Sequence, residues 1–414
     1  MIRQFDIALV GGGVSGLASA LAIAAEFDRV KQRPPSMVLI DAAESPLATE
    51  PMPADAISVD SFDPRVVALT ETNCAILAEW GVWSEIAASG AGDYRRMFVW
   101  DGEGTASIDF DCTEVGLERL GAVVENRVLV SALFNRLQDL GVCHCRYGMS
   151  VTGIEQDAEG GATIQFDDGS SLQASLLVGA DGARSVVKSL CGFESREWDY
   201  GQDAIVCTVE TELSHQHTAW QCFTRHGPLA FLPVSRSEEP GEHYCSIVWS
   251  LERERATELM GLEAADFASA MQESFESRLG ELKAVSQRFS FPLWQRHSKQ
   301  YVRGSAVLVG DAAHTLHPLA GQGINIGLKD ARSLAAALAK SAVKGRALSN
   351  LPMLRRFERE RLTENLAMMA AVEFFKRLYS PGSSVLQLLR NRGMAVVDAQ
   401  AALKRQIIKL AVGQ

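Results

Sequence analysis

The strongest constraint on the fold lies at the N-terminus of the chain. A short apolar run, residues 5–10, is followed by a glycine-rich turn at residues 11–16 and a helical pattern at residues 17–27. A second apolar run, residues 37–40, ends at Asp41. This β-α-β pattern carries G-x-G-x-x-G at its first turn, where a dinucleotide pyrophosphate rests on the helix N-terminus and the later acid accepts ribose hydroxyls. The residues expected to bind the dinucleotide here are Gly11, Gly13, Ser15, Gly16 and Asp41.

Two later stretches run in the same way from a buried strand through an acid and a glycine into a helix. In the first, residues 176–179 lead into Asp181 and Gly182. In the second, residues 305–309 lead into Asp311, and a long helical pattern covers residues 322–340. Asp311 is suited to accept hydrogen bonds from ligand hydroxyls, while glycines at 321 and 323 allow backbone N–H groups close to a negatively charged ligand. Three such turns from one sheet predict a single cofactor site.

The middle of the chain has a different pattern. Short alternating strands are expected at residues 204–211, 218–224, 229–234 and 244–249, followed by a helix at residues 257–279. This pattern favours a largely antiparallel sheet with one covered face, which can form the floor of a substrate pocket. The residues expected to line that pocket are Phe231, Pro233 and Trp249.

Together these patterns predict an α/β protein: a Rossmann-like dinucleotide-binding domain, an inserted and mainly antiparallel β-sheet domain, and a C-terminal helical region. The expected boundaries are 1–80, 120–190 and 296–350 for the first domain, 81–119 and 191–295 for the second, and 351–414 for the helices. The helices of the last region are expected at 351–379, 385–392 and 394–412.

Charge is distributed unevenly along the chain. The net charge of −11 makes nucleic acid an unexpected partner. Residues 351–414 nevertheless contain 11 Lys and Arg against 5 Asp and Glu, a net charge of +6, which leaves −17 for the rest. This basic, apolar-rich tail could touch a membrane surface or an acidic partner, or it could be a solvated helix face. With no span, signal peptide or C-x-x-C pair evident, a cytoplasmic protein is expected, with peripheral membrane contact and homo-oligomerisation left open.

Two arginines extend the expected site. Arg65 opens an apolar run, residues 66–69, and could neutralise a phosphate, although a surface arginine is the alternative. A helix is expected from residue 123 to residue 140, so Arg127 would lie in its first turn. A cation there opposes the helix dipole, which suggests that something anionic lies nearby.

The glycine turn and the two acid–glycine turns occur in the order found in the single-component, FAD-dependent aromatic hydroxylases, the p-hydroxybenzoate-hydroxylase-like flavoprotein monooxygenases. Within that group the chain resembles the ubiquinone-biosynthesis hydroxylases, and most of all their 2-polyprenylphenol hydroxylase branch. The stretches that carry this resemblance are 65–69, 99–101, 198–200, 230–233, 247–251, 310–323 and 389–393.

The resemblance implies tightly bound, non-covalent FAD, NAD(P)H as transient reductant, and O2 as the source of an oxygen atom transferred to a polyprenylated phenol. It places the pyrophosphate at the first glycine turn, Arg65 and Arg127 along the phosphates, and the ribityl hydroxyls at Asp311. Asp181 and Gly182 would serve the mobile FAD and the nicotinamide. The residues implied to line the isoalloxazine are Pro318, Gly321, Gln322, Gly323, Ile324 and Asn325.

Three histidines and the function as a whole have alternative interpretations. His314 and His317 have a spacing that suits a metal, but no carboxylate or cysteine completes a ligand set, so no metal is expected. His226 could help to deprotonate a phenol, or it could be a solvated or structural histidine. A different class of function is a flavin-binding scaffold or accessory subunit of a quinone-biosynthesis complex; a class A hydroxylase of another phenol is a further alternative.

Overall fold

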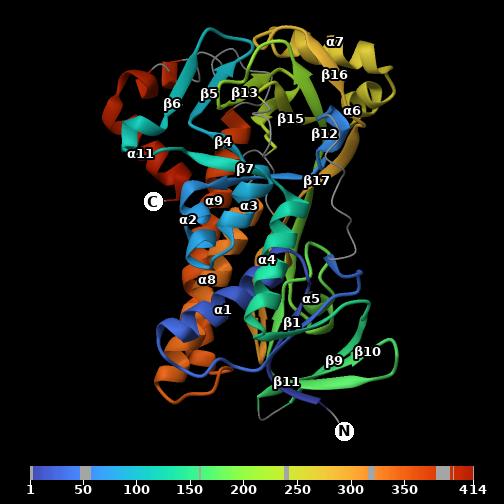
Figure 1. Cartoon of the computed structure of the whole chain (residues 1–414), viewed down its shortest axis with the longest axis vertical. Coiled ribbons are helices and arrows are strands. Elements are labelled where there is room, and N and C mark those ends of the chain that lie inside the picture. The colour runs from blue at the N-terminus through green and yellow to red at the C-terminus, as the bar shows by residue number, and fades with distance from the viewer. Residues whose placement is uncertain are drawn as a thin grey trace.

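The computed structural model describes residues 3–46, 57–157, 160–236, 242–315, 322–378, 392–394 and 396–413. One large sheet lies in the lower half of the molecule and another in the upper half, with long helices beside the lower sheet (Figure 1). This mixed α/β architecture confirms the predicted fold class.

The first sheet has eight strands, and the N-terminal strand lies near its centre. Its neighbours are parallel to it, so that Ile7 pairs with Leu176 on one side and with Met37 on the other. The main strand order is β18 (Val302–Arg303), β19 (Ala306–Leu308), β11 (Ser171–Gly179), β1 (Arg3–Val10), β2 (Met37–Ile40) and β8 (Cys143–Arg146). An antiparallel arm is formed by β9 (Val151–Asp157) and β10 (Gly161–Phe166), and β10 joins β11.

Helices bury the apolar faces of this sheet. α1 packs against α8 and α4, and its residues Leu17, Leu21 and Ile23 are fully buried in the largest core cluster. Because both faces of a parallel sheet are covered, its strands are apolar runs rather than alternating ones. The helices in this half are α1 (Val14–Arg29), α4 (Asn126–Leu140), α5 (Val186–Leu190), α8 (Gln322–Val343) and α9 (Leu351–Leu378).

A small three-stranded sheet corrects one prediction. The helix expected from residue 123 starts only at Asn126, because Val123 and Val124 belong to a strand, β7, that pairs with β3. Both valines are buried, which suits a strand between two covered faces. The elements of this region are η2 (Val59–Ser61), β3 (Val66–Thr70), α2 (Glu71–Glu79), α3 (Trp83–Gly90), β4 (Gly92–Tyr94) and β7 (Gly121–Glu125).

The second large sheet has nine strands, and all but one of its neighbouring pairs are antiparallel. Two helices cover one of its faces, where the single predicted helix 257–279 is interrupted at Gly261. The strands, in sheet order, are β20 (His314–Thr315), β17 (Phe289–Ser298), β12 (Ser195–Thr211), β15 (Tyr244–Glu252), β14 (Gly227–Pro233), β13 (Thr218–Thr224), β5 (Arg96–Asp101) and β6 (Ser107–Asp111). The remaining elements are β16 (Leu282–Val285), paired with β12, and the helices α6 (Arg253–Met260) and α7 (Ala264–Ser274).

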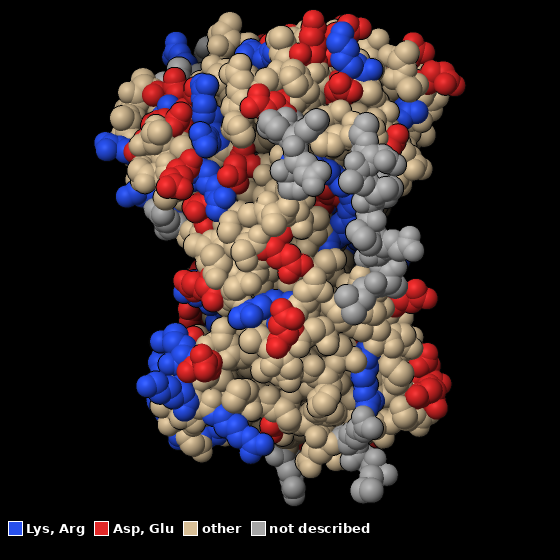
Figure 2. Space-filling view, viewed as in Figure 1, with Lys and Arg blue, Asp and Glu red and all other residues tan. Residues whose placement is uncertain are grey.

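The C-terminal region contains α9 and a last helix, α11 (Ala401–Val412), which contacts η3 (Cys112–Val115) beside the second sheet. The predicted middle helix at 385–392 lies almost entirely outside the described residues. Across the described residues, none of the helices combines the length and the apolar character needed to span a bilayer. Acidic and basic side chains are interspersed over the face shown in Figure 2, so the charge there is not gathered into one patch.

Candidate functional site

The first glycine turn combines tight packing with an open cradle. A Cβ atom on Gly11, whose φ is +114°, would overlap the Ala180 carbonyl, and one on Gly16 would overlap the Gly11 carbonyl. A Cβ on Gly13 would meet nothing within 4 Å. Gly13 is also the N-cap of α1, which begins without a side-chain cap and without an acidic residue in its first turn. The first N–H groups of α1 thus have no side-chain cap, and the open space beside Gly13 leaves room for an anion at this helix end.

Asp41 lies beside this turn at the end of β2. Its carboxylate accepts hydrogen bonds from the Gly12 N–H and, at 2.7 Å, from the Ala43 N–H. Tyr147 completes this corner, since a Cβ on Gly12 would lie 2.8 Å from its ring. Its hydroxyl is buried with no partner among the described residues. The sequence reasoning missed Tyr147, although its position directly after β8, the strand next to β2, could have indicated it.

One carboxylate oxygen of Asp181 is hydrogen-bonded within the protein, and the other is not. Its Oδ2 accepts hydrogen bonds from the N–H groups of Val186 (2.7 Å) and Val187 (3.0 Å), and so holds the start of α5. Its Oδ1 is buried and has no partner within the described part of the chain. Burial raises the pKa of this carboxyl, even though these hydrogen bonds oppose the shift. Gly182 follows with a φ of +77°, which turns the chain toward the helix.

Asp311 lies in the turn η4 (Gly310–Ala312) and lines the large cavity described below. No donor among the described residues reaches its carboxylate, and burial raises its pKa. A Cβ on Gly323 would lie 3.6 Å from Asp311 Oδ1, so the start of α8 stands close to the carboxylate. Ser15 is the residue that Gly310 makes room for: a Cβ at 310 would overlap the Ser15 hydroxyl. Ser15 thus packs α1 against this turn.

A buried polar network below η4 was not anticipated from the sequence. Asp330 of α8 is completely buried and accepts hydrogen bonds from the Gly310 N–H at 3.0 Å and from Arg361 Nε at 2.7 Å. It also contacts His314 Nε2 at 2.5 Å. Burial alone would raise the pKa of Asp330, but the His314 ring and the Arg361 guanidinium outweigh it and hold the pKa below its ordinary value. The available signal was that Asp330, the only acid in residues 322–343, lies four positions from both Ile326 and Leu334 and so on their helix face.

Asn325 also has a structural task. Its side-chain oxygen accepts hydrogen bonds from the Thr70 N–H (3.0 Å) and from Asn73 Nδ2 (2.7 Å), and its amide donates to the Ala68 carbonyl (2.8 Å). The side chain therefore ties α8 to β3 and α2, and its place beside the isoalloxazine stays a prediction. Gly323 and Ile324, by contrast, line the cavity.

The two predicted arginines differ in their surroundings. Arg65 is exposed at the start of β3 and lines one end of the cavity. Arg127 donates hydrogen bonds to Glu125 Oε2 at 2.8 Å and to the Ser61 carbonyl at 2.8 Å. Glu125 is buried and also forms an ion pair with Arg236. The anion expected near the first turn of α4 is thus present in the chain itself.

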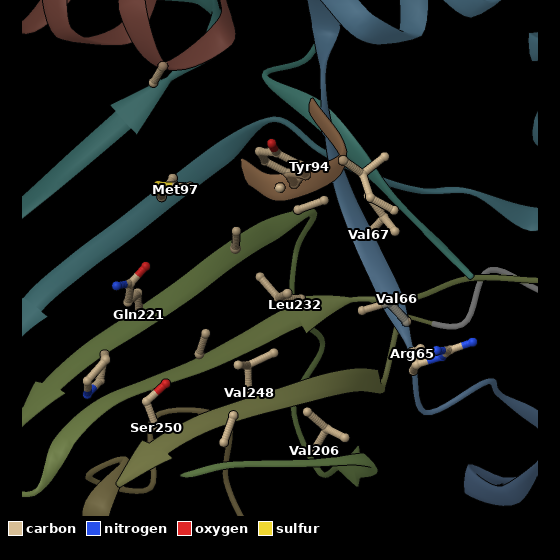
Figure 3. Close-up of a pocket in the computed structure, with 18 of the residues that line it drawn as sticks. Arg65, Val66, Val67, Tyr94, Met97, Val206, Gln221, Leu232, Val248 and Ser250 are labelled. Carbon is tan, nitrogen blue, oxygen red and sulfur yellow. The ribbon is translucent and has the colours of Figure 1, made fainter. Parts of the chain in front are cut away.

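A cavity of about 680 Å³ runs between the second sheet, β3 and α11. The sheet contributes alternate residues: Ala204, Val206, Ala219, Gln221, Pro228, Ala230, Leu232, Val248 and Ser250. Figure 3 shows Arg65 and Val66 at one end of this space and Met97 and Gln221 at the other.

The predicted pocket residues require a correction. Phe231 and Trp249 are buried on the opposite face of the sheet, packed against α7, and Pro233 shares the face of Phe231 because strand side chains alternate. The side chains that line the cavity are therefore those of neighbouring residues on the same strands, Ala230 and Leu232 on β14 and Val248 and Ser250 on β15. His226 lies in the turn between β13 and β14, where it accepts a hydrogen bond from Arg225, and it is not among the residues that line the cavity.

The remaining predicted residues lie at the edge of what the structure describes. Pro318 and Gly321 fall outside the described residues, as does His317, while Gln322 begins α8. Within the described part of the chain, no group of three or more His, Cys, Asp or Glu side chains could hold a metal ion.

Comparison with known proteins agrees with this geometry. The family model described as "FAD binding domain" matches residues 52–371. A relative from Escherichia coli K12, 3-demethoxyubiquinol 3-hydroxylase, is 33% identical over 99% of this chain and 98% of its own length. The human ubiquinone biosynthesis monooxygenase COQ6 is 32% identical over 98% of this chain and 92% of its own. This chain belongs to the family of FAD-binding monooxygenases.

A solved structure with a similar fold is the p-nitrophenol 4-monooxygenase PnpA of Pseudomonas putida, with a TM-score of 0.76 and 18% identity over 99% of each chain. The family model and the relatives, rather than this likeness of fold, show that the protein is an FAD-dependent oxidoreductase, and its residues fit the cofactor. An uncapped helix start, open space at Gly13 and a carboxylate at Asp311 that no described donor reaches are what a pyrophosphate and a hydroxylated chain require.

Proposed function

We propose that the protein hydroxylates the aromatic ring of a polyprenylated phenol in ubiquinone biosynthesis, using O2 and NAD(P)H. The names of its relatives support the pathway, including the ubiquinone hydroxylase UbiL of Rhodospirillum rubrum, which is 32% identical over 99% of this chain and 89% of its own length. The observation that carries the substrate class is the cavity, which has Asp311 in its wall and is otherwise lined mainly by apolar residues. Its volume lies in the range of about 300 to 1,000 Å³ that is usual for small-ligand sites.

Three parts of the chain would hold FAD. The uncapped start of α1 would face the pyrophosphate, and Asp41, with Tyr147 beside it, would face the adenosine half. Asp311 would accept hydrogen bonds from the ribityl hydroxyls, which would repay part of the cost of burying its carboxylate. When bound, FAD takes reducing equivalents from NAD(P)H and with O2 supplies the oxygen atom that enters the ring.

The chain's contribution to the reaction is positioning and exclusion of water. Apolar side chains on β12, β13, β14 and β15 form the floor on which a phenolic ring would lie. Gln221 and Ser250 are the polar side chains on that floor, and each could hydrogen-bond the phenol hydroxyl and so orient the ring. Closing such a site against water protects reactive oxygen chemistry from wasteful side reactions.

The test is oxidation of NADH and NADPH by the purified, FAD-loaded protein with and without a short-chain 2-prenylphenol. We expect the phenol to accelerate oxidation and the product to gain one oxygen atom by mass spectrometry. A yellow protein whose NAD(P)H oxidation is unaffected by any prenylphenol would contradict the proposal and favour the scaffold alternative.

A further inference from the structure

The last helix of the chain forms one wall of the cavity. α11 contributes four lining residues, all of them apolar: Ile407, Ile408, Ala411 and Val412. Ile408 and Val412 are buried in a core cluster shared with the second sheet and β7. The helix is fixed in place by Lys404, whose ammonium lies 2.9 Å from Glu114 of η3. The wall is thus part of the folded structure.

The wall around α11 differs in chemistry from the wall at Asp311. Asp311 lines the cavity beside Thr315, whose hydroxyl donates a hydrogen bond to the Asp311 carbonyl, and beside the start of α8 at Gly323. The lining residues that share the core cluster with α11 are almost all apolar: Val66, Ala68, Tyr94, Met97, Phe110, Leu120, Ala219 and Leu232. A ligand that suits both walls has a polar ring and a long hydrocarbon.

The apolar surface of α11 also continues beyond the cavity. Leu403, Ile407, Leu410 and Ala411 recur at the spacing of a single helix face. Ile407 and Ala411 line the cavity, whereas Leu403 and Leu410 are exposed, Leu410 by 65%. A hydrocarbon that is too long for the cavity would therefore find a further apolar strip along the same helix.

We propose that α11 is the wall against which the isoprenoid chain of the substrate lies, and that Ile407 and Ala411 determine how much binding is gained from each added isoprene unit. This inference rests on the proposed substrate class. Its physical basis is that apolar area removed from water increases affinity in proportion to the area.

The test compares Ala411→Phe with a matched control, Ala402→Phe, in the FAD-loaded protein. Both alanines are exposed on α11, but only Ala411 lines the cavity. The dissociation constants of 2-prenylphenols with one and with three isoprene units would be measured by isothermal titration calorimetry. We expect the wild type to bind the three-unit phenol at least tenfold more tightly than the one-unit phenol. Ala411→Phe should remove most of that difference, and Ala402→Phe should keep it.

A second variant, Ile407→Thr, keeps the branch at Cβ but replaces the ethyl group with a hydroxyl, and it should reduce the same difference. Equal weakening of both phenols in Ala411→Phe, or no gain with chain length in the wild type, would overturn the inference. Turnover by the same samples separates the two proposals. Chain-length-dependent binding without hydroxylation would refute the proposed function but support the role of α11. Hydroxylation without chain-length-dependent binding would support the proposed function but refute the role of α11.

Discussion

Replacing Asp330 by Asn tests whether the buried network below η4 holds the FAD-binding turn. Asp330 is fully buried, and Arg361, its ionic partner, is only 4% exposed. Removing one partner of a buried ion pair costs about 3 to 5 kcal/mol, because the other charge stays buried without compensation. Arg361 keeps contacts with Glu364 and Asn365, so we expect a loss near the lower end, about 3 kcal/mol.

The assay is urea unfolding with and without FAD, combined with the dissociation constant of FAD. Glu364→Gln is the matched control, since it removes the other carboxylate on Arg361, which is 57% exposed, and should cost less than about 1 kcal/mol. Because Asp330 also accepts the Gly310 N–H, Asp330→Asn should weaken FAD binding and Glu364→Gln should not. Equal destabilisation by the two variants would refute the reasoning.

The pH dependence gives a second check on the same residue. The pKa of Asp330 is held below its ordinary value, so its carboxylate stabilises the fold at any pH above the unfolded pKa of about 4. That stabilisation is lost as the pH falls through the depressed pKa. The free energy of unfolding of the wild type should therefore fall more between pH 5 and strong acid than that of Asp330→Asn. An equal fall in the two proteins would contradict this.

The remaining predictions concern single side chains. Gly16→Ala should prevent stable folding by overlapping the Gly11 carbonyl, whereas Gly13→Ala should keep the thermal midpoint and lose FAD, measured as bound flavin per protein. Arg65→Ala should change stability by less than about 0.5 kcal/mol but weaken FAD binding, since its exposed side chain is free to meet a phosphate. Arg127→Ala should cost about 1 to 3 kcal/mol in urea unfolding through its lost hydrogen bonds. Phe231→Ala should cost about 3 to 5 kcal/mol, with ligand affinity nearly unchanged because its ring faces away from the cavity.

Local patterns predicted the parts of the fold that depend on neighbouring residues. The β-α-β unit and the acid at each strand end follow from apolar runs, glycines and spacing, so Asp41, Asp181 and Asp311 could all be placed on turns after buried strands. Parallel strands end at one edge of their sheet, and this is why three turns predicted one site.

Long-range partners could not be predicted in this way. Asn325 hydrogen-bonds Thr70, 255 positions earlier, and nothing in the sequence near either residue records that contact. Alternation along β14 shows which residues share a face but not which face a helix will cover, and this is why Phe231 was assigned to the cavity rather than to the core under α7.

The order of strands in the first sheet has a consequence for synthesis of the protein. β1 is made at once, but its neighbour β11 is translated only at residues 171–179, and β19, on the far side of β11, at residues 306–308. Through most of translation, therefore, the nascent chain carries an apolar strand with an unpaired edge, which is the kind of surface that aggregates or recruits chaperones. The cradle for FAD cannot close until the ribosome has passed η4, so cofactor loading must follow, rather than guide, the early steps of folding.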